Sequence, residues 1–254
     1  MAGWPVRAPE RWQEAGARFE RALGWSIARP APDPWLVELE GLVLELRLTG
    51  SGQVGVFPEQ APNWRWIADR VAGRVTAGGA ANVLDLFAYT GGATLAAARA
   101  GGQVTHVDAV RSALTWARAD AAASGLAEAP IRWIPDEALR FARRELRRGR
   151  TYDLIVLDPP SYGQGPGGQR WRLADQLPEL LATCARLLTP DPLGLLLSAH
   201  SAGLGPDDLT AAVVEAIADS RAVGGRGPVE GLPLVLEAAS GTRLPLGAAA
   251  RWTP

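Results

Sequence analysis

The sequence feature that most constrains the fold is a regular alternation of short apolar runs and helical patterns, which begins at residue 82. The runs expected to form strands are 82–86, 104–107, 131–134, 152–157 and 193–198. The helices expected around them are 63–75, 92–100, 111–124, 137–148, 173–188 and 206–218, and a final antiparallel pair is expected at 232–237 and 242–246. Alternating strands and helices form a doubly wound parallel sheet, which binds ligands at the carboxyl ends of its strands. We therefore expect the functional residues in the loops that follow the strands.

The segment before this region has a different style. Residues 35–40 and 42–48 alternate apolar and polar side chains on both sides of Gly41, which predicts a β-hairpin. The chain is thus expected to divide into an N-terminal β-rich extension, residues 1–60, and a main domain, residues 61–254.

Composition limits the classes of protein to consider. The chain has 254 residues, of which 47% are apolar and 21% charged, with a formal net charge of −1, as is ordinary for a globular protein. Its single cysteine excludes an internal disulfide framework and a zinc site built from cysteines, so we expect no metal. No apolar run approaches the roughly 20 residues that cross a bilayer, and the N-terminus lacks the pattern of a signal peptide. We expect a cytoplasmic protein without a membrane segment.

The loop after the first strand of the alternating region has the features of a nucleotide site. Asp85 closes the strand, Gly91 and Gly92 open the next helix, and the second strand ends in Asp108. Glycines allow the backbone to approach a ligand, and a helix start offers unpaired N–H groups. A carboxylate at the position of Asp108 can accept hydrogen bonds from both hydroxyls of a ribose. Either acidic residue alone is more simply a helix cap or a solvated strand end, but the two in this order favour a nucleotide.

The charge of Asp85 indicates which nucleotide binds. A dinucleotide site needs the pattern Gly-x-Gly-x-x-Gly, so that a pyrophosphate can lie at the helix N-terminus, and this loop has only Gly91 and Gly92. Asp85 would repel an anion but attract a cationic amino-acid group. S-adenosylmethionine (SAM) carries an ammonium and a sulfonium, so the loop predicts SAM rather than NAD. Asp136 or Glu137, after the third strand, is placed to accept the adenine amino group.

The fourth strand ends in Asp158, which is followed by two prolines, Ser161 and Tyr162. Consecutive prolines stiffen the chain and end the strand, which fixes the Asp158 carboxylate and the neighbouring carbonyl groups. Such a platform could hold a planar ring that bears an amine, with Tyr162 stacked on it. Methyl transfer depends chiefly on aligning the nucleophile with the sulfonium, so positioning supplies much of the rate. The alternative is a plain turn, but its place after two nucleotide signals favours a function.

In these motifs the chain resembles a family of class I SAM-dependent methyltransferases close to the bacterial large-subunit rRNA cytosine-5 methyltransferases. The shared stretches are GVFPEQAPNW (55–64), VLDLFAYTGGATLAAARAG (83–101), VTHVDAVRSALTWARADAAASGL (104–126), YDLIVLDPPSYGQGP (152–166) and LPLGAAARW (244–252). The resemblance implies a Rossmann-like, seven-stranded class I methyltransferase sheet with a short N-terminal β-hairpin extension, in which residues 61–254 form the methyltransferase domain. It also implies that Gln60 and Asn63 lie beside the cofactor.

The residue patterns and the resemblance together define an expected site. Its SAM-binding members are Gln60, Asn63, Asp85, Phe87, Ala88, Tyr89, Thr90, Gly91, Gly92, Asp108, Ala109, Asp136, Glu137 and Asp158. Asp158, Tyr162 and His200 are the expected catalytic residues: the first two position the target, and His200, after the fifth strand, could act as a general base. His200 is equally well explained as a solvated residue at the rim.

The chain departs from that family in two respects. The rRNA cytosine-5 methyltransferases use a cysteine after the fifth strand to attack ring carbon C6, and residues 197–201 contain none. The single cysteine, Cys184, lies in a helical apolar stripe and is expected in the core. The family also carries an N-terminal RNA-binding module, for which the extension of this chain is too short. Both departures weaken nucleic acid as the substrate, and the first blocks the usual covalent route to carbon 5.

Three further features have simpler or competing explanations. His106, inside the second strand, is expected to be a satisfied core residue. The arginines of 140–150 are expected to form a solvated helix face rather than an RNA footprint. The glycine-rich loop 163–168, with Arg170, Trp171 and Arg172, is a better candidate for contacting a substrate, because it follows the platform and offers an aromatic surface.

Three hypotheses for the function follow. The leading one is methyl transfer from SAM to a base of RNA, in particular ribosomal RNA, at a nitrogen or by a route that needs no cysteine. The second keeps the cofactor but replaces RNA with a small molecule or a protein, which the near-neutral charge favours. The third is a SAM-binding protein without catalysis. Tryptophans of the N-terminal segment, among them Trp4 and Trp12, either pack the hairpin on the sheet or form the contact of a homodimer.

Overall fold

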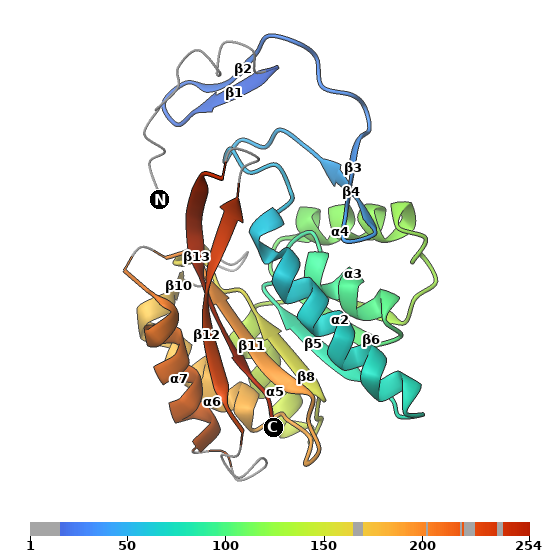
Figure 1. Ribbon diagram of the computed structural model, residues 1–254, viewed down its shortest axis with the longest axis vertical. Helices are drawn as coiled ribbons and strands as arrows, with labels where there is room; N and C mark the ends of the chain where they lie inside the picture. Colours follow the sequence, from blue (N-terminus) through green and yellow to red (C-terminus); the bar gives the residue numbers. More distant parts are fainter. Residues whose placement is uncertain (1–15, 165–169, 202, 219, 221–226, 238–240) are drawn as a thin grey trace.

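The computed structural model describes residues 16–164, 170–201, 203–218, 220, 227–237 and 241–254. A seven-stranded sheet forms its centre, with the strands in the order β12-β13-β11-β8-β5-β6-β7 (Figure 1). The strands are β5 Asn82–Leu86, β6 Gln103–Asp108, β7 Ile131–Pro135, β8 Leu154–Leu157, β11 Gly194–Ala199, β12 Val229–Glu237 and β13 Arg243–Trp252. Neighbours from β11 to β7 are parallel, whereas β13 is antiparallel to both β11 and β12. The predicted Rossmann-like sheet is confirmed.

Helices cover both faces of this sheet. They are α2 Ala61–Thr76, α3 Gly92–Arg99, α4 Arg111–Ala123, α5 Ala138–Arg147, α6 Leu173–Ala185 and α7 Pro206–Ala218. Successive residues of a strand point to opposite faces, so Leu84 of β5 packs in the core with α5, α6 and α7, while Val83 packs in the core with α2 and α3. In Figure 1, α6 and α7 accordingly lie on one side of the sheet and α2 and α3 on the other. All residues of β8 and β11 are buried, as predicted for strands covered on both faces.

Two hairpins precede the sheet in the described part of the chain. β3 Trp35–Leu39 and β4 Leu42–Leu46 form the predicted hairpin, and β1 Ala17–Glu20 pairs with β2 Gly24–Ile27 in a second one. The sequence analysis does not predict β1–β2: each strand has only four residues, so its alternation is too short to indicate a strand, and neither strand contains a buried residue. Trp4 and Trp12 lie outside the described residues.

The β3–β4 hairpin is fastened to α4 by hydrogen bonds between its backbone and side chains of the helix. Asp120 Oδ1 accepts from the backbone N–H of Glu45 at 2.8 Å, and Trp116 Nε1 donates to the Glu45 carbonyl at 2.9 Å. One turn on, Ser124 Oγ contacts both the N–H and the carbonyl oxygen of Val43 at 3.0 Å. The hairpin is therefore packed on α4 as a fixed part of the domain.

The last strand is longer than predicted. β13 continues to Trp252, whereas the sequence pattern predicts its end at residue 246. The missed half contains Gly247 and three alanines, small residues that give no strand signal. They are required because β13 lies very close to β11: a Cβ on Gly247 would be 2.5 Å from the carbonyl oxygen of Ala199.

Two other elements also depart from the prediction. A 3₁₀ turn, η1 Pro58–Gln60, leads directly into α2, so the helix begins earlier than expected. In place of the beginning of the predicted loop 163–168, β9 Tyr162–Gln164 pairs with β10 Arg170–Arg172, and residues 165–169 lie outside the described part. Among the helices that the structure describes, none is both long and apolar enough to cross a membrane.

Candidate active site

The loop between β5 and α3 is a tight coil at the carboxyl end of β5. Phe87 and Tyr89 have positive φ angles of 60° and 49°, and Gly91 has one of 88°. Such conformations are costly for residues other than glycine and concentrate at ligand sites. Hydrogen bonds from Ala88 N to Val107 O (3.1 Å) and from Gly91 N to Ala88 O (2.9 Å) hold the coil. The backbone of the predicted SAM loop is therefore fixed by contacts within the protein.

Gly92 has no room for a side chain, and the structure gives a reason that the sequence does not. A Cβ at this position would lie 2.2 Å from the indole of Trp64 on α2. The glycine therefore allows α3 to pack against α2, in addition to any approach to a ligand. Next to it, Thr90 Oγ1 donates to the Gly55 carbonyl at 2.6 Å. This bond ties the segment 55–64 to the SAM loop.

Asp85 lies at the floor of the site with 2% of its surface exposed. Its Oδ2 accepts a hydrogen bond of 2.6 Å from Thr94 Oγ1. Burial raises the pKa of Asp85 to about 7, and the carboxylates of Asp158 and Asp108 add to the rise, while the Thr94 bond opposes it. A cation beside Asp85 would relieve the cost of its charge, which supports the predicted contact with the ammonium of SAM.

His106 continues this chain of contacts into the core. Its Nδ1 lies 2.9 Å from Thr94 Oγ1, and burial lowers the pKa of His106 to about 3, so the ring is neutral. The residue is fully buried, as predicted, but Nε2 has no hydrogen-bond partner among the described residues. His106 is therefore only half satisfied, and its one bond goes to the residue that holds Asp85.

Asp108 is not a solvated strand end. Its Oδ2 accepts from Tyr89 N at 2.9 Å and its Oδ1 from Val110 N at 2.8 Å. Burial raises the pKa of Asp108, against the effect of these two backbone hydrogen bonds. Asp108 and Ala109 both line the larger of two cavities, where the carboxylate keeps lone pairs for the hydroxyls of a ribose.

Asp136 and Glu137 line the same cavity but already have partners within the chain. Asp136 forms ion pairs with Arg140 and with Arg144 (2.6 Å), which outweigh burial and lower the pKa of Asp136. Glu137 caps α5 by accepting from Leu139 N at 2.9 Å and Arg140 N at 2.8 Å. The contact with the adenine amino group stays a prediction, in which Asp136 or Glu137 would share its carboxylate with these partners.

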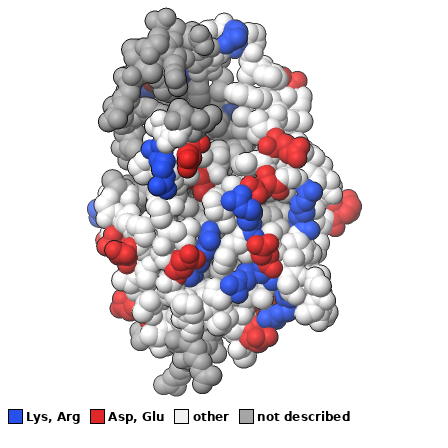
Figure 2. Space-filling model, viewed as in Figure 1, with Lys and Arg blue, Asp and Glu red and all other residues white. Residues whose placement is uncertain are grey.

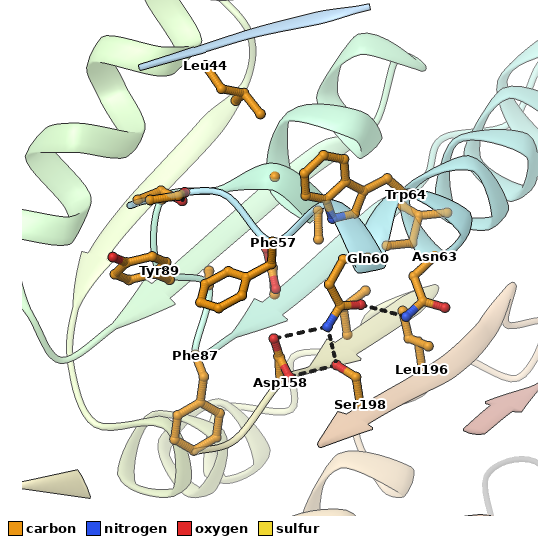
Figure 3. A pocket seen from close by; sticks show the side chains of 18 residues that line it. Leu44, Phe57, Gln60, Asn63, Trp64, Phe87, Tyr89, Asp158, Leu196 and Ser198 are labelled. Atoms are coloured by element: carbon orange, nitrogen blue, oxygen red, sulfur yellow. Dashed lines mark hydrogen bonds between the residues drawn. The ribbon is translucent and has the colours of Figure 1, made fainter. Parts of the chain in front are cut away.

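At the end of β8, the Asp158 carboxylate is the centre of a hydrogen-bond network (Figure 3). Ser198 Oγ donates to its Oδ1 at 2.8 Å, and Gln60 Nε2 donates to its Oδ2 at 3.2 Å. Gln60 Nε2 also lies 3.1 Å from Ser198 Oγ, and Gln60 Oε1 accepts from Asn63 Nδ2 at 2.6 Å. The structure therefore brings Gln60, Asn63 and Asp158 together, as the sequence comparison implied.

His200 lies against this carboxylate rather than in solvent. Its Nε2 is 3.6 Å from Asp158 Oδ1, and its Nδ1 is 3.0 Å from the Leu246 carbonyl and 3.6 Å from Glu59 Oε1. Burial opposes the charge of the ring, but the interactions with Asp158, the Leu246 carbonyl and Glu59 outweigh it and raise the pKa of His200 to about 9. At neutral pH the ring is an imidazolium, which cannot accept a proton. This geometry favours a role for His200 in holding Asp158 over the predicted role of general base.

Two cavities with shared lining residues lie at the carboxyl ends of the strands. The smaller has a volume of about 60 Å³ and is lined by Asp85, Gln60, Trp64 and Ser198, among others. The larger measures about 840 Å³, and its walls include the Asp108 and Asp136 side. Asp158 lines both cavities, so it marks their junction. An ammonium near Asp85 and a nucleoside near Asp108 would place the sulfonium at this junction, so the residues present fit the cofactor.

At the rim of the larger cavity, Trp171 does not offer the aromatic surface that the sequence predicts. Trp171 is buried: its ring packs on Phe87 with centroids 4.9 Å apart, and Nε1 donates to the Pro160 carbonyl at 2.6 Å. It fixes the proline platform from behind and offers no free face for stacking. Tyr162 is the exposed aromatic residue at this rim, with 72% of its surface accessible.

The end of β11 and the residues after it supply polar groups but no thiol. Ser198 and His200 occupy the stretch 197–201, while Cys184 is fully buried in α6, as predicted. Burial also raises the pKa of the Cys184 thiol, which makes it unreactive. Among the residues that the structure describes, no cluster of three or more histidine, cysteine or acidic side chains could hold a metal ion.

A known protein family matches this chain. The matched residues include the acidic ends of β5 and β6 and the platform after β8. The sequence profile of the S-adenosylmethionine-dependent methyltransferases matches residues 13–219. The chain belongs to this family. The match covers most of this chain. It confirms the predicted cofactor, SAM, and the predicted class of enzyme, a methyltransferase.

Solved structures agree. The crystal structure of a SAM-dependent methyltransferase from Agrobacterium tumefaciens is 38% identical, with a TM-score of 0.88 over 99% of this chain and 81% of that protein. A protein of Streptococcus mutans assigned to the SAM-dependent methyltransferases shares 17% identity and a TM-score of 0.71, over 91% of this chain and 58% of that protein. The second likeness concerns the fold alone.

Curated relatives include enzymes named for ribosomal RNA. Ribosomal RNA large subunit methyltransferase I of Shewanella denitrificans is 29% identical over 71% of this chain and 43% of the relative. Ribosomal RNA large subunit methyltransferase K/L of Shewanella frigidimarina is 29% identical over 61% of this chain and 21% of the relative. The predicted resemblance to large-subunit rRNA methyltransferases is confirmed, and the chain spans less than half the length of these relatives.

Several residues of the site are not predicted by sequence reasoning. Glu59, which is 5% exposed and contacts His200, lies inside the shared segment 55–64, where its neighbours Gln60 and Asn63 attract attention instead. Ser198 lies in the stretch 197–201, where the related enzymes have their cysteine. The missing cysteine draws attention there, and the serine that donates to Asp158 is overlooked. Arg251 donates to Asn63 from the far end of the chain, and no local pattern indicates that contact.

Proposed function

We propose that this methyltransferase transfers the methyl group of SAM to a nitrogen atom of an RNA base, with ribosomal RNA as the acceptor. Two of the relatives described above are named as ribosomal RNA large subunit methyltransferases. The observation in this chain that carries the proposal is the Asp158 carboxylate, which Gln60, Ser198 and His200 hold at the junction of the two cavities.

Asp158 is suited to orient an acceptor that bears an N–H group. When bound, SAM supplies an electrophilic methyl group on its sulfonium. The Asp158 carboxylate accepts hydrogen bonds from Gln60 and Ser198. It accepts a further hydrogen bond from the N–H of the base, which directs that nitrogen toward the junction. The proton that leaves the nitrogen passes to Asp158 or to solvent. A ring C–H could not satisfy the carboxylate in this way, and the residues after β11 provide no thiol for covalent attack on a ring carbon.

The rim supports a nucleic acid as the bearer of that base. Tyr162 is exposed directly after the platform, where a base can stack on its ring. Arg147 and Arg170 line the larger cavity and form no ion pair within the described part of the chain. We assign them to the phosphates that flank the target base.

Methylation of purified rRNA tests the proposal. We expect tritium from labelled SAM to enter rRNA from a strain that lacks the gene, and not the already methylated rRNA of the wild-type strain. Mass spectrometry of the nucleosides then identifies the methylated atom. Asp158→Asn should lower the rate by about 10²-fold or more, as removal of a proton-accepting group does, whereas Asp207→Asn, an exposed change on α7, should have no effect. Equal incorporation into both rRNAs, or a methyl group on carbon, would overturn it.

A small molecule or a protein is the second candidate acceptor, and the charge distribution favours it. The net charge is only −1, and acidic and basic side chains are interspersed on the face that Figure 2 shows. On α5, Arg143 pairs with Glu179, and Arg140 and Arg144 pair with Asp136. This candidate predicts a salt-independent KM for the acceptor, whereas an RNA acceptor predicts a KM that rises steeply with salt.

The proposal extends to location and assembly. A ribosomal substrate would place the enzyme in the cytoplasm, with residues 1–60 as an extension of a methyltransferase domain formed by residues 61–254. A homodimer through the N-terminal hairpins is motivated by Leu23 and Ile27, which are 81% and 55% exposed. Light scattering at several protein concentrations tests that contact, and a monomer throughout would reject it.

A further inference from the structure

The C-terminal strand β13 reaches the active site through two buried amides. Arg251 donates to Asn63 Oδ1 from both Nε (3.0 Å) and Nη2 (2.7 Å). Asn63 Nδ2 donates to Gln60 Oε1 at 2.6 Å, and Gln60 Nε2 donates to Asp158 Oδ2 at 3.2 Å. An unbroken chain of hydrogen bonds therefore joins a guanidinium on β13 to the carboxylate at the cavity junction, and Figure 3 shows its last two links.

The direction of every bond in this chain follows from the chemistry of its two ends. A guanidinium has only donors, so the atom of Asn63 that faces Arg251 must be the carbonyl oxygen. The NH₂ group of Asn63 then faces Gln60, whose carbonyl oxygen must accept. The NH₂ group of Gln60 consequently faces Asp158, which as a carboxylate only accepts. Both charged ends impose the same order on the amides.

Burial makes this order costly to disturb. Asn63 is fully buried and Gln60 is 6% exposed, so water cannot readily replace a lost partner. The guanidinium of Arg251 is itself held in place, since it lies 5.8 Å from the ring of Trp66 and across from Glu230 on β12. The same strand supplies the Leu246 carbonyl that fixes the Nδ1 proton of His200.

We propose that Arg251 is a positioning residue, which orders the Asn63 and Gln60 amides so that Gln60 presents its NH₂ group to Asp158. Through this order β13 keeps the Asp158 carboxylate aimed at the acceptor, a consequence that rests on the proposed role of Asp158. Loss of the guanidinium leaves Asn63 Oδ1 buried without a donor. Rotation of Asn63 to find one then withdraws the partner of Gln60 and loosens the hold on Asp158.

Gln60 Nε2 also lies 3.2 Å from His200 Nε2. A rotation of the Gln60 amide would therefore disturb the contacts of both Asp158 and His200 at the end of the chain of hydrogen bonds.

NMR of the side-chain NH₂ group of Gln60 in the full chain with bound S-adenosylhomocysteine tests the proposal without an acceptor. Arg251→Met should shift and broaden the Gln60 NH₂ signals, because the amide loses its fixed orientation, and Arg251→Lys, which keeps a donor, should restore most of the wild-type signals. Asn63→Asp should also shift them, because an acceptor facing Gln60 turns the Gln60 carbonyl toward Asp158. In methylation assays kcat should fall in Arg251→Met and Asn63→Asp and recover in Arg251→Lys.

Arg70→Met is the matched control. Arg70 stacks on the same Trp66 ring at 5.4 Å and donates to Thr253 Oγ1, but it does not contact Asn63. Unchanged Gln60 NH₂ signals in Arg251→Met, an equal change in Arg70→Met, or no restoration by Arg251→Lys would overturn the inference. Asn63→Asp gives an independent result if Arg251→Met does not fold. A wild-type enzyme that is inactive on rRNA would refute the proposed function, and the Gln60 signals would still decide the role of Arg251.

Discussion

At the residue scale, Asp85 carries a high electrostatic cost, because it is buried while Asp108 and Asp158 lie near enough to repel it. The hydrogen bond from Thr94 offsets part of this cost. Only the ionised form attracts the ammonium of SAM. Cofactor affinity and the charge of Asp85 are therefore linked.

We expect SAM binding to weaken as the pH falls below 7. Without ligand, burial raises the pKa of Asp85 to about 7, and below that value each pH unit reduces the ionised fraction, so the Kd should rise up to about tenfold per unit. Titration calorimetry across neutral pH measures this dependence. Methylthioadenosine lacks the amino-acid group and should bind without the trend. A Kd for SAM that ignores pH would contradict the contact with Asp85.

Thr94→Val tests the support beneath Asp85. The substitution keeps the shape of the side chain but removes the hydroxyl that donates to Asp85 and contacts His106. We expect the Kd of SAM to rise about tenfold, the magnitude of a lost hydrogen bond to a charged group, and that of methylthioadenosine to stay unchanged. Thr94→Ser, which retains the hydroxyl, should bind SAM nearly as wild type does. Equal weakening of both ligands would mean that the hydroxyl serves packing alone.

At the element scale, the β3–β4 hairpin docks on α4 through the carboxyl group of Asp120, which is buried away from water. Asp120 is fully buried, and its Oδ2 has no hydrogen-bond partner among the described residues. Burial raises the pKa of Asp120 to about 7, against the N–H of Glu45. An acid whose pKa is higher in the folded chain than in the unfolded one contributes less stability as the pH rises between the two values.

The free energy of unfolding of Asp120→Asn, relative to that of wild type, should therefore increase as the pH rises from about 4 to about 7. The reason is that the amide keeps an acceptor for Glu45 N and never ionises. The measurement is the Tm of both proteins over this range. Asp120→Ala, which removes the acceptor, should be less stable than Asp120→Asn at every pH. A constant difference between the Asn variant and wild type would show that Asp120 does not ionise here.

The strands illustrate what a local pattern can and cannot predict. β8 is predicted well because four buried apolar residues in a row leave little alternative. The second half of β13 is missed because Gly247 and the alanines after it give no local strand signal, and the space beside Ala199 that Gly247 fits is a tertiary constraint. The β1–β2 hairpin is missed because each of its strands has only four residues.

At the scale of the whole molecule, the SAM site joins segments that are far apart in the sequence. η1, the β5–α3 loop, the end of β8 and the end of β11 all line the two cavities. A ligand that contacts all of them should stabilise the domain as a unit.

We expect SAM to raise the Tm. At a concentration of about 100 times the Kd, a ligand stabilises the fold by about 2.7 kcal/mol, which corresponds to about 5–10 °C for a domain of this size. Scanning calorimetry measures the shift, and Asp108→Ala should reduce it at the same SAM concentration. A shift of the same size with Asp108→Ala would exclude this carboxylate from the site.

The sequence by itself determined the sheet and the cofactor, and it singled out the acidic residues at the strand ends. Strand–helix alternation, strand ends and the order of Asp85, Asp108 and Asp158 are local signals, because each depends on neighbours in the chain. Only the tertiary structure placed His200 between Asp158 and Glu59, which raise its pKa, and showed that Trp171 is a buried support. Charge state and burial are set by groups that approach from distant segments, so no pattern along the chain can encode them.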